Sequence, residues 1–267
     1  MPELPEVETI KNSLKTCLKG QTIKSCEVSL PKLVSPDDFA EKIKGQSIND
    51  LKRRGKVLLI FLRNWVLLVH FKLTGQLIYL ENPLSPPPYT HIEFSLEKGK
   101  LYYADLRQFG RLVLWPVKEL DECPLLKKLG PEPFELNIDT FFRLLNKSSR
   151  KIKTFLLDQE KITGLGNIYV DESLFRAGVH PERPANSLSF EEAQRLLKTI
   201  KEILNEAINL GGSSVRNYVD GHGESGRFQE KHLVYGRRGK PCPKCQKPLA
   251  YAHIAGRGTT FCPYCQK

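Results

Sequence analysis

The spacing of apolar residues changes partway along the 267-residue chain, and this change limits the folds open to it. Up to about residue 117, apolar residues occur in short β-branched and aromatic runs separated by turn residues, a pattern typical of antiparallel strands. From about Pro133 the period lengthens to that of helices, most regularly over 191–210. An N-terminal β-sandwich or barrel followed by helices is therefore predicted, an α+β, multidomain chain. The clearest strand candidates are 56–62, 66–71, 91–96 and 100–104.

The first residues predict a short amphipathic helix that starts almost at residue 1. Val7, Ile10 and Leu14 recur at helical spacing over residues 5–18. Pro5 suits a first helical turn, where its missing amide hydrogen needs no partner. Acidic residues in such a turn complement the helix dipole, which is a sufficient explanation for them before any chemistry is considered.

The charge of the chain favours a polyanionic partner. It has 41 Lys and Arg against 30 Asp and Glu, a formal net charge of +11 and a pI near 9.3. Clustered on one face, these charges would attract nucleic acid, whereas a dispersed excess would only aid solubility. Motifs must decide between the two.

The chain has no pattern that directs it out of the cell or into a membrane. It opens MPELPEVETI, without the basic start and apolar run of a signal peptide, and its longest apolar stretch is too short to span a bilayer. We therefore expect a cytoplasmic protein with no membrane partner. An odd count of seven cysteines also argues against a disulfide framework.

Four of the cysteines form two CxxC pairs near the C-terminus, with residues 246–261 between the pairs. Tetrahedral zinc binds four thiolates, and each CxxC turn supplies two. The spacing predicts one structural zinc ion per chain, because a closed shell of four cysteines leaves no open position for catalysis. Between the pairs, residues 255–260 predict a hairpin turn that presents Arg257, a candidate DNA contact. The metal ligands are Cys242, Cys245, Cys262 and Cys265.

Pro2 is a candidate nucleophile. Removal of the initiator methionine would leave its secondary amine at the N-terminus, and an α-amino group titrates near pH 8, so that a useful fraction is unprotonated at neutral pH. Amines of this kind attack sugar C1′ and form an iminium, which divides one difficult step into two easier ones. Glu3 and Glu6 flank the amine and could transfer protons.

Five motifs in order resemble formamidopyrimidine-DNA glycosylase over the whole chain. They are PELPEVETI at the start, RRGKVLLI at 53–60, LRQFG at 106–110, GLGNIYVDESLF at 164–175, and the terminal AGRGTTFCPYCQ. The resemblance implies an N-terminal catalytic β-sandwich (1–131) that carries the first helix, a helix-two-turn-helix DNA-binding domain (132–231) and a four-cysteine zinc finger (232–267), with DNA in the cleft between the sandwich and the helical domain.

The resemblance also implies the reaction. It assigns Pro2 as the Schiff-base nucleophile, Glu3 as the acid in glycosidic cleavage, and Lys56 as a proton donor in β-elimination. Arg257 matches an arginine implicated in δ-elimination and phosphate binding. The implied activity is excision of 8-oxoguanine and formamidopyrimidines from double-stranded DNA, followed by AP lyase cleavage at the abasic site.

Other residues match positions where the family contacts or distorts DNA. Family members fill the gap left by the everted base with a methionine, an arginine and a phenylalanine; here Leu73 replaces the methionine, while Arg107 and Phe109 match. Leucine keeps the apolar wedge but not the adaptability of a thioether. The glycine-rich stretch 215–226 resembles a mobile loop that closes over the base. The predicted DNA-binding residues are His70, His91, Arg107, Lys153 and Asn167.

Three other interpretations remain open at this point. An endonuclease VIII type enzyme would excise oxidised pyrimidines, although PELPEV differs from the Pro-Glu-Gly-Pro start of that relative. A catalytically silent lesion-binding protein would have no use for Pro2, Glu3 and Lys56. A zinc-ribbon RNA-binding protein would make the N-terminal motif a coincidence. The leading expectation is a monomeric, nucleoid-associated bacterial enzyme.

Overall fold

The computed structural model describes residues 2–215 and 217–267, which form two compact units. The first unit comprises the chain up to Lys127 together with Leu210–Gln229, and the second comprises Lys128–Asn209 and Glu230–Lys267. Sequence reasoning put the first boundary close by, after residue 131, but placed 210–229 with the helices. None of the helices in the described ranges is long and apolar enough to cross a membrane.

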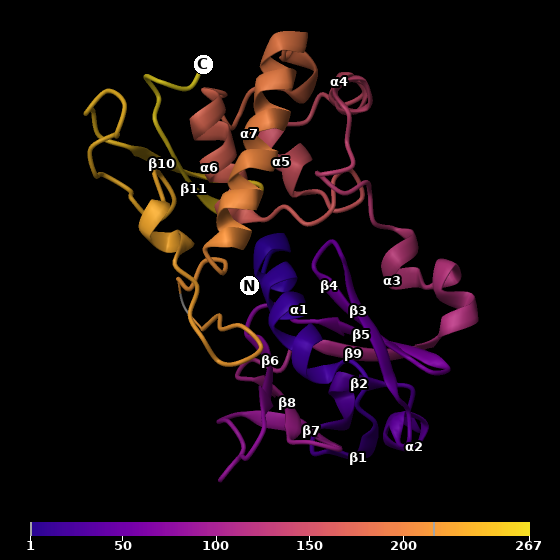
Figure 1. Ribbon diagram of the computed structural model, residues 1–267. Coiled ribbons are helices and arrows are strands. Elements are labelled where there is room, and N and C mark those ends of the chain that lie inside the picture. The colour runs from indigo at the N-terminus through magenta and orange to yellow at the C-terminus, as the bar shows by residue number, and fades with distance from the viewer. Residues whose placement is uncertain (1, 216) are drawn as a thin grey trace. The chain divides into compact units, whose positions relative to one another are not determined.

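The first unit contains two sheets (Figure 1). Neighbouring strands are antiparallel except β2 and β9, which are parallel. One sheet has the order β1 (Ile23–Val28), β7 (Thr90–Leu96), β8 (Lys100–Asp105), β6 (Gly75–Leu80), and the other β2 (Val34–Ser35), β9 (Arg111–Pro116), β5 (Trp65–His70), β4 (Val57–Leu62), β3 (Ile48–Arg54). The unit also contains the short helices α2 (Phe39–Ile43) and α3 (Pro124–Lys127). The predicted strands and the N-terminal sandwich are confirmed.

Alternation along β4 shows why its sequence is a continuous apolar run. Leu58, Ile60 and Leu62 pack into the main core with α1 (Leu4–Leu18). Leu59, one position out of phase, packs into a second cluster around Cys123. Because successive side chains of a strand point to opposite faces, a strand buried on both faces must be apolar at every position.

Two ion pairs align α1 with β3. Glu8 accepts from Arg53 at 2.9 Å, and Lys15 lies 2.7 Å from Asp50. The earlier helix residue pairs with the later strand residue, so the helix runs antiparallel to β3. The start of α1 is thereby directed toward the β3–β4 turn.

The segment 210–229 is fixed to the first unit by hydrogen bonds. Gly221 donates its N–H to Ser13 Oγ of α1 at 2.9 Å and accepts at its carbonyl from Tyr79 N of β6 at 2.8 Å. Gly226 lies so close to the carbonyls of Gly211 and Gly212 that a Cβ would clash with both. The composition of this glycine-rich segment predicted a mobile loop, whereas the structure holds it by several hydrogen bonds. Its contacts place it with the sandwich. Arg216 lies outside the described residues.

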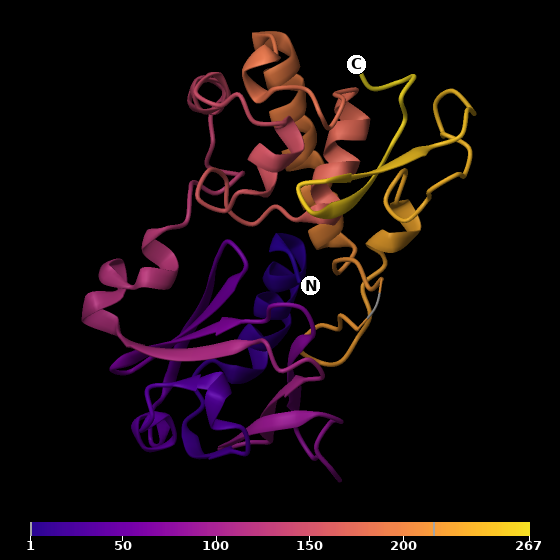
Figure 2. The same cartoon turned by 180° about the vertical axis from the view of Figure 1, so that it is seen from behind.

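The second unit is helical, as predicted (Figures 1 and 2). Gly178, with a φ of 74°, ends α6 in the left-handed conformation that favours glycine. Most of α6 is buried, including Tyr169 and Phe175, and it packs against α7. The elements are α4 (Ile138–Asn146), α5 (Ile152–Leu157), α6 (Asn167–Ala177), α7 (Phe190–Asn209), β10 (Ala250–Ile254) and β11 (Arg257–Phe261).

The cysteine-containing segment 232–267 packs with these helices as part of one unit. Phe175 of α6 lies in one apolar cluster with Cys242, Cys262 and Leu249. The carboxylate of Glu172 is fully buried and accepts hydrogen bonds from the backbone N–H groups of residues 233, 234 and 235 at 2.8–3.1 Å. Helix α6 therefore supports the segment that sequence reasoning treated as a separate domain.

Candidate active site

Pro2 and Glu3, the first residues that the structure describes, are buried, and a reciprocal capping arrangement holds Glu3. Pro2 is buried, and the side chain of Glu3 is only 3% exposed. Glu3 precedes the first turn of α1: its carboxylate accepts from the backbone of Glu6, and Glu6 Oε2 accepts from Glu3 N at 2.8 Å. The predicted methionine removal concerns Met1, which lies outside the described residues.

Glu6 also connects this start to the segment 210–229. Its Oε1 accepts from Ser213 N at 2.8 Å, and Tyr218 Oη donates to its backbone carbonyl at 3.3 Å. Burial raises the pKa of Tyr218, and the charge of Glu6 raises it further, so the phenol stays a donor. Sequence reasoning gave Glu6 a supporting role and missed Tyr218, although a lone Tyr among Gly, Ser and Asp was a usable signal.

Lys56 lies in the turn between β3 and β4 and is 7% exposed. The turn contains Gly55, whose φ of +56° favours glycine. Arg53 bonds to Glu8 of α1 through Nε and donates from its Nη1 atom to the carbonyl of Gly55 at 3.0 Å. One arginine therefore joins the turn that carries Lys56 to the first half of α1.

His70, at the end of β5, is held neutral. Burial lowers its pKa to about 4, and the positive charges of Lys72 and Lys56 lower it further. Its Nδ1 accepts from Lys72 N at 3.1 Å. A neutral imidazole that accepts at Nδ1 carries its proton on Nε2, so His70 offers a neutral N–H donor.

Asp105, 1% exposed, organises the two loops that carry the predicted wedge residues. Its Oδ1 accepts from the hydroxyl of Thr74, next to Leu73, and from Arg107 N at 3.2 Å. Its Oδ2 accepts from Gly110 N at 2.8 Å. A carboxylate with several donors is well suited to this task because charge-assisted hydrogen bonds are the stronger ones. Sequence reasoning missed Asp105.

The wedge residues themselves are close to one another and accessible. The Arg107 guanidinium lies over the Phe109 ring at 5.0 Å, and Phe109 is 51% exposed. Leu73 is half-buried in the neighbouring turn. His91 Nε2 lies 3.1 Å from the carbonyl of Asp105 and must donate to it, since a carbonyl only accepts. His91, a predicted DNA-binding residue, therefore supports the loop that follows Asp105.

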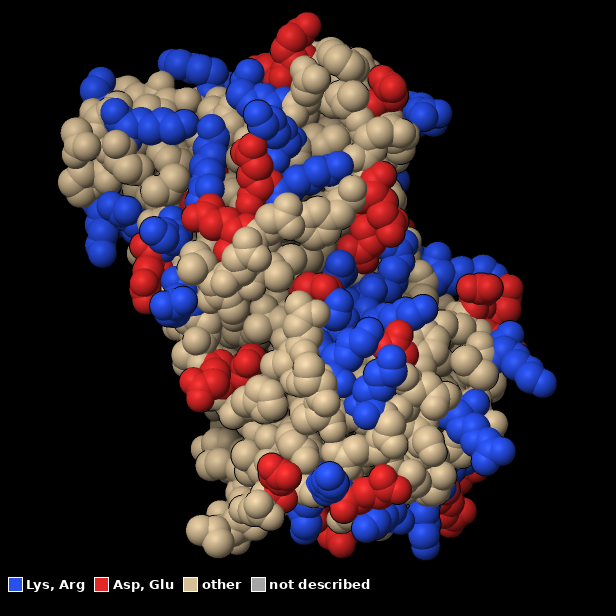
Figure 3. All heavy atoms as spheres, viewed as in Figure 1, with Lys and Arg blue, Asp and Glu red and all other residues tan. Residues whose placement is uncertain are grey.

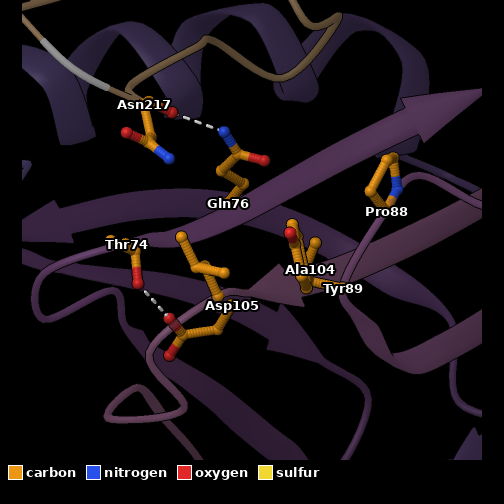
Figure 4. Close-up of a pocket in the computed structure, with 8 residues that line it drawn as sticks. Thr74, Gln76, Pro88, Tyr89, Ala104, Asp105 and Asn217 are labelled. Atoms are coloured by element: carbon orange, nitrogen blue, oxygen red, sulfur yellow. Dashed lines mark hydrogen bonds between the residues drawn. The ribbon is translucent and has the colours of Figure 1, made fainter.

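A small pocket adjoins this loop in the first unit (Figure 4). Gln76 of β6 donates across it to the carbonyl of Asn217. Its lining combines polar groups with the rings of Pro88 and Tyr89. The lining residues are Thr74, Gln76, Pro88, Tyr89, Ala104, Asp105, Leu106 and Asn217.

The second unit gathers the remaining predicted residues around the β10–β11 hairpin. Ala255 and Gly256 form its two-residue turn with φ of 55° and 66°, and Arg257 follows, exposed. Asn167, the first residue of α6, donates from Nδ2 to the carbonyl of Gly258 at 3.0 Å. Lys153 differs from expectation: it is 0% exposed, so the structure does not favour its predicted contact with phosphate.

The four cysteines of the CxxC pairs form a potential metal site. Their four Sγ atoms all lie within 4.8 Å of one another. Cys242 and Cys265 sulfurs are 3.9 Å apart, and those of Cys245 and Cys262 are 3.5 Å apart. A tetrahedral zinc with bonds of about 2.3 Å requires sulfur separations near 3.8 Å, so the donors fit zinc.

Lys and Arg side chains cover this module, seen at the upper left of Figure 3. Residues 232–267 contain no Asp or Glu. A surface of one sign attracts a polyanion. The basic residues are Arg237, Arg238, Lys240, Lys244, Lys247, Arg257 and Lys267.

Comparisons with known proteins agree over the whole chain. Residues 1–112 match the family described as Formamidopyrimidine-DNA glycosylase N-terminal domain, and residues 129–219 match the Formamidopyrimidine-DNA glycosylase H2TH domain. Formamidopyrimidine-DNA glycosylase of Shouchella clausii is 45% identical over 273 residues, covering 100% of this chain and 99% of its own length. That of Bacillus licheniformis is 44% identical, with full coverage of both.

Solved structures agree as well. A Lactococcus lactis Fpg mutant in complex with DNA containing Fapy-dG is 37% identical with a TM-score of 0.94, covering 100% of both chains. A MutM complex with DNA containing carbocyclic 8-oxo-G is 38% identical with a TM-score of 0.93 and the same coverage. MutM (Fpg) from Thermus thermophilus is 43% identical with a TM-score of 0.91, covering 99% of this chain and 98% of its own.

Proposed function

The chain belongs to the formamidopyrimidine-DNA glycosylase family, and from this premise we propose that it excises oxidised purines from double-stranded DNA and then cleaves the abasic site. The observation that carries the proposal is full-length similarity to relatives whose structures hold Fapy-dG and 8-oxo-G DNA. The fit to the whole chain also argues against an RNA-binding zinc ribbon.

In the proposed first step, the Pro2 amine attacks C1′ of the damaged nucleotide after removal of Met1. The C1′–N9 bond breaks, its electron pair leaves with the base, and a proton completes the departing base. Glu3 supplies the acid–base function. It follows Pro2 in the sequence, is buried, and is held in the capping arrangement. Loss of the remaining amine proton and opening of the sugar ring then produce a Schiff base at C1′.

In the proposed lyase steps, a proton is removed from C2′ and the 3′ phosphate leaves, after which δ-elimination releases the 5′ phosphate. Lys56 is placed in the turn that Arg53 fixes to α1, and there it transfers protons during β-elimination. Arg257, exposed on its hairpin, stabilises the phosphate in the second elimination.

In the proposed complex, Arg107, Phe109 and Leu73 enter the stack and replace the everted base. Bases acted on by enzymes must leave the stack, and an inserted side chain offsets part of the lost stacking. His70 and Asn167 contribute neutral N–H donors near the phosphates, and His91 acts through the Asp105 loop. The segment 215–226 covers the base. Tyr218 of this segment and Ser213 just before it bond to Glu6, which would couple the covering of the base to the nucleophile end of α1.

One structural zinc ion, held by Cys242, Cys245, Cys262 and Cys265, completes the proposal. It would supply the stability that a short module without a large core lacks. It supplies no chemistry to the reaction, because a four-thiolate shell has no open position.

The proposal is tested by borohydride trapping on a duplex with 8-oxoguanine opposite cytosine, with mass spectrometry to locate the adduct. We expect a covalent adduct at Pro2, and we expect Glu3→Gln to trap far less from the 8-oxoguanine duplex. An adduct only on a preformed abasic site would retain the lyase and refute the assigned base. No adduct on either duplex would favour a lesion-binding protein without catalysis.

A further inference from the structure

Lys153 of α5 has an ammonium group that is fully buried and specifically bonded. Its Nζ donates to Asp171 Oδ1 of α6 at 2.6 Å and to Thr259 Oγ1 of β11 at 2.7 Å. The side chains of Lys153 and Asp171 are 0% and 1% exposed. Charges withdrawn from water this completely must be paired and hydrogen-bonded. The contacts with Asp171 and Thr259 therefore allow the Lys153 ammonium group to be buried.

The residues around Lys153 also form hydrogen bonds with neighbouring positions of β11. Asp171 Oδ2 lies 3.4 Å from Thr260 N, and Asn167 Nδ2 donates to the carbonyl of Gly258 at 3.0 Å. Three consecutive strand residues, 258–260, are therefore held from two helices. The residue immediately before them is Arg257, whose side chain is exposed.

The backbone on the other side of Arg257 is the tight hairpin turn at Ala255 and Gly256. Because the Arg257 side chain is exposed at this turn, its direction depends on the strand that follows it. A shift of β11 by a fraction of an ångström would be transmitted to the guanidinium, and bidentate phosphate recognition is geometrically strict.

We propose that Lys153 and Asp171 are positioning residues that hold β11 so that Arg257 meets a DNA phosphate, and that Lys153 does not touch the DNA. The inference rests on the proposed function, since it takes DNA as the partner of Arg257. It replaces the phosphate contact that the family resemblance implied for Lys153.

The test is a double-mutant cycle between Lys153→Met and Arg257→Ala. Methionine keeps much of the length of the lysine side chain and removes the charge. Affinity is measured on a duplex with a tetrahydrofuran abasic analogue, which is not cleaved, over a severalfold range of KCl. Arg257→Ala should weaken binding and reduce the salt slope by about 1, the value expected for one lost phosphate contact.

Positioning predicts a non-additive cycle. Lys153→Met alone should weaken binding about as much as Arg257→Ala, and it should cause no further loss of affinity or salt slope in the Arg257→Ala background. A direct phosphate contact predicts additive losses and a further decrease of about 1 in the slope, which would overturn the inference.

Two further variants separate positioning from general damage. Lys201→Met, in α7, removes an ammonium that donates to the carbonyls of Phe134 and Leu136, and it should leave DNA affinity close to wild type. If Lys153→Met fails to fold because Asp171 keeps a buried charge, the pair Lys153→Met with Asp171→Leu removes both charges. That double variant should fold and bind like Arg257→Ala; wild-type affinity in it would refute the inference.

Failure of the inference and failure of the proposed function give different results. A wild-type protein that does not bind the duplex would refute the proposed function together with this inference. Additive losses in a wild-type protein that binds would refute the inference alone.

Discussion

The two units bury their charged groups differently. In the first unit a large apolar core of two sheets and α1 provides the stability, and buried carboxylates such as Glu6 and Asp105 bind mainly backbone N–H groups of adjoining loops. In the second unit, α6 buries Asp171 against Lys153 and uses Glu172 to hold the cysteine-containing segment. We therefore expect loss of one polar contact to cost the sandwich less than loss of the Glu172 contacts or of the proposed metal costs the cysteine-containing segment.

The strongest test of this contrast is metal removal. Chelation or Cys245→Ser should unfold the module at 232–267 and abolish DNA binding while the sandwich stays folded, because structural zinc supplies roughly 10–16 kcal/mol in comparable modules. Metal content, circular dichroism and binding to lesion DNA would be measured, with Cys17→Ser as the control. A stripped protein with full activity would contradict the structural role of the metal.

The next largest effect is expected at Glu172. Glu172→Gln replaces a charged acceptor of three backbone N–H groups with a neutral amide, and about 3 kcal/mol of unfolding free energy should be lost. Denaturant unfolding measures this loss. Glu206→Gln, which breaks only the partly exposed pair with Arg176, should cost less than about 1 kcal/mol. Equal effects of the two substitutions would remove the distinction between buried and exposed carboxylates.

In the first unit, Asp105→Asn should cost about 1–2 kcal/mol, because the amide offers one acceptor where the carboxylate had two. The wedge loops would loosen, so excision of 8-oxoguanine should slow by about 10-fold while cleavage of a preformed abasic site is less affected. Single-turnover rates on the two duplexes measure the difference. Asp121→Asn, exposed on the surface, is the control. Equal slowing on both duplexes would show that Asp105 does not act through the wedge.

At neutral pH the smallest effect is expected from one buried histidine in each unit, and it grows as the pH falls. Burial lowers the pKa of His70 and of His232 to about 4. The unfolded histidine titrates near 6.5, so between about pH 6.5 and 4 the unfolded state binds more protons and stability falls as the pH falls. Each histidine should contribute about 1 kcal/mol per pH unit, and His70→Gln or His232→Gln should remove its share. Above about pH 7.5 variant and wild type should have parallel profiles, because the unfolded histidine is also neutral there. An unchanged acid slope would show that the histidine is not held neutral.

Much of the secondary structure and several candidate site residues could be predicted from local sequence patterns. Alternation in β4 and helical spacing in α7 predict secondary structure because each position depends on which face is buried, a local property of the chain. The two CxxC pairs similarly imply a metal site, since the two ligands of each pair are only three residues apart in the sequence.

The groups that support the site could be identified only from contacts between distant parts of the chain. Asp105 joins loops about thirty residues apart, Tyr218 reaches Glu6 across most of the chain, and Lys153 points inward to Thr259. The same holds for residues 210–229, which belong to the sandwich and not to the helices that precede them. Local periodicity carries no record of such partners, because a polar side chain between apolar neighbours can face water or a distant backbone group. The choice is made by packing and by the free-energy cost of leaving a buried polar group without a hydrogen bond.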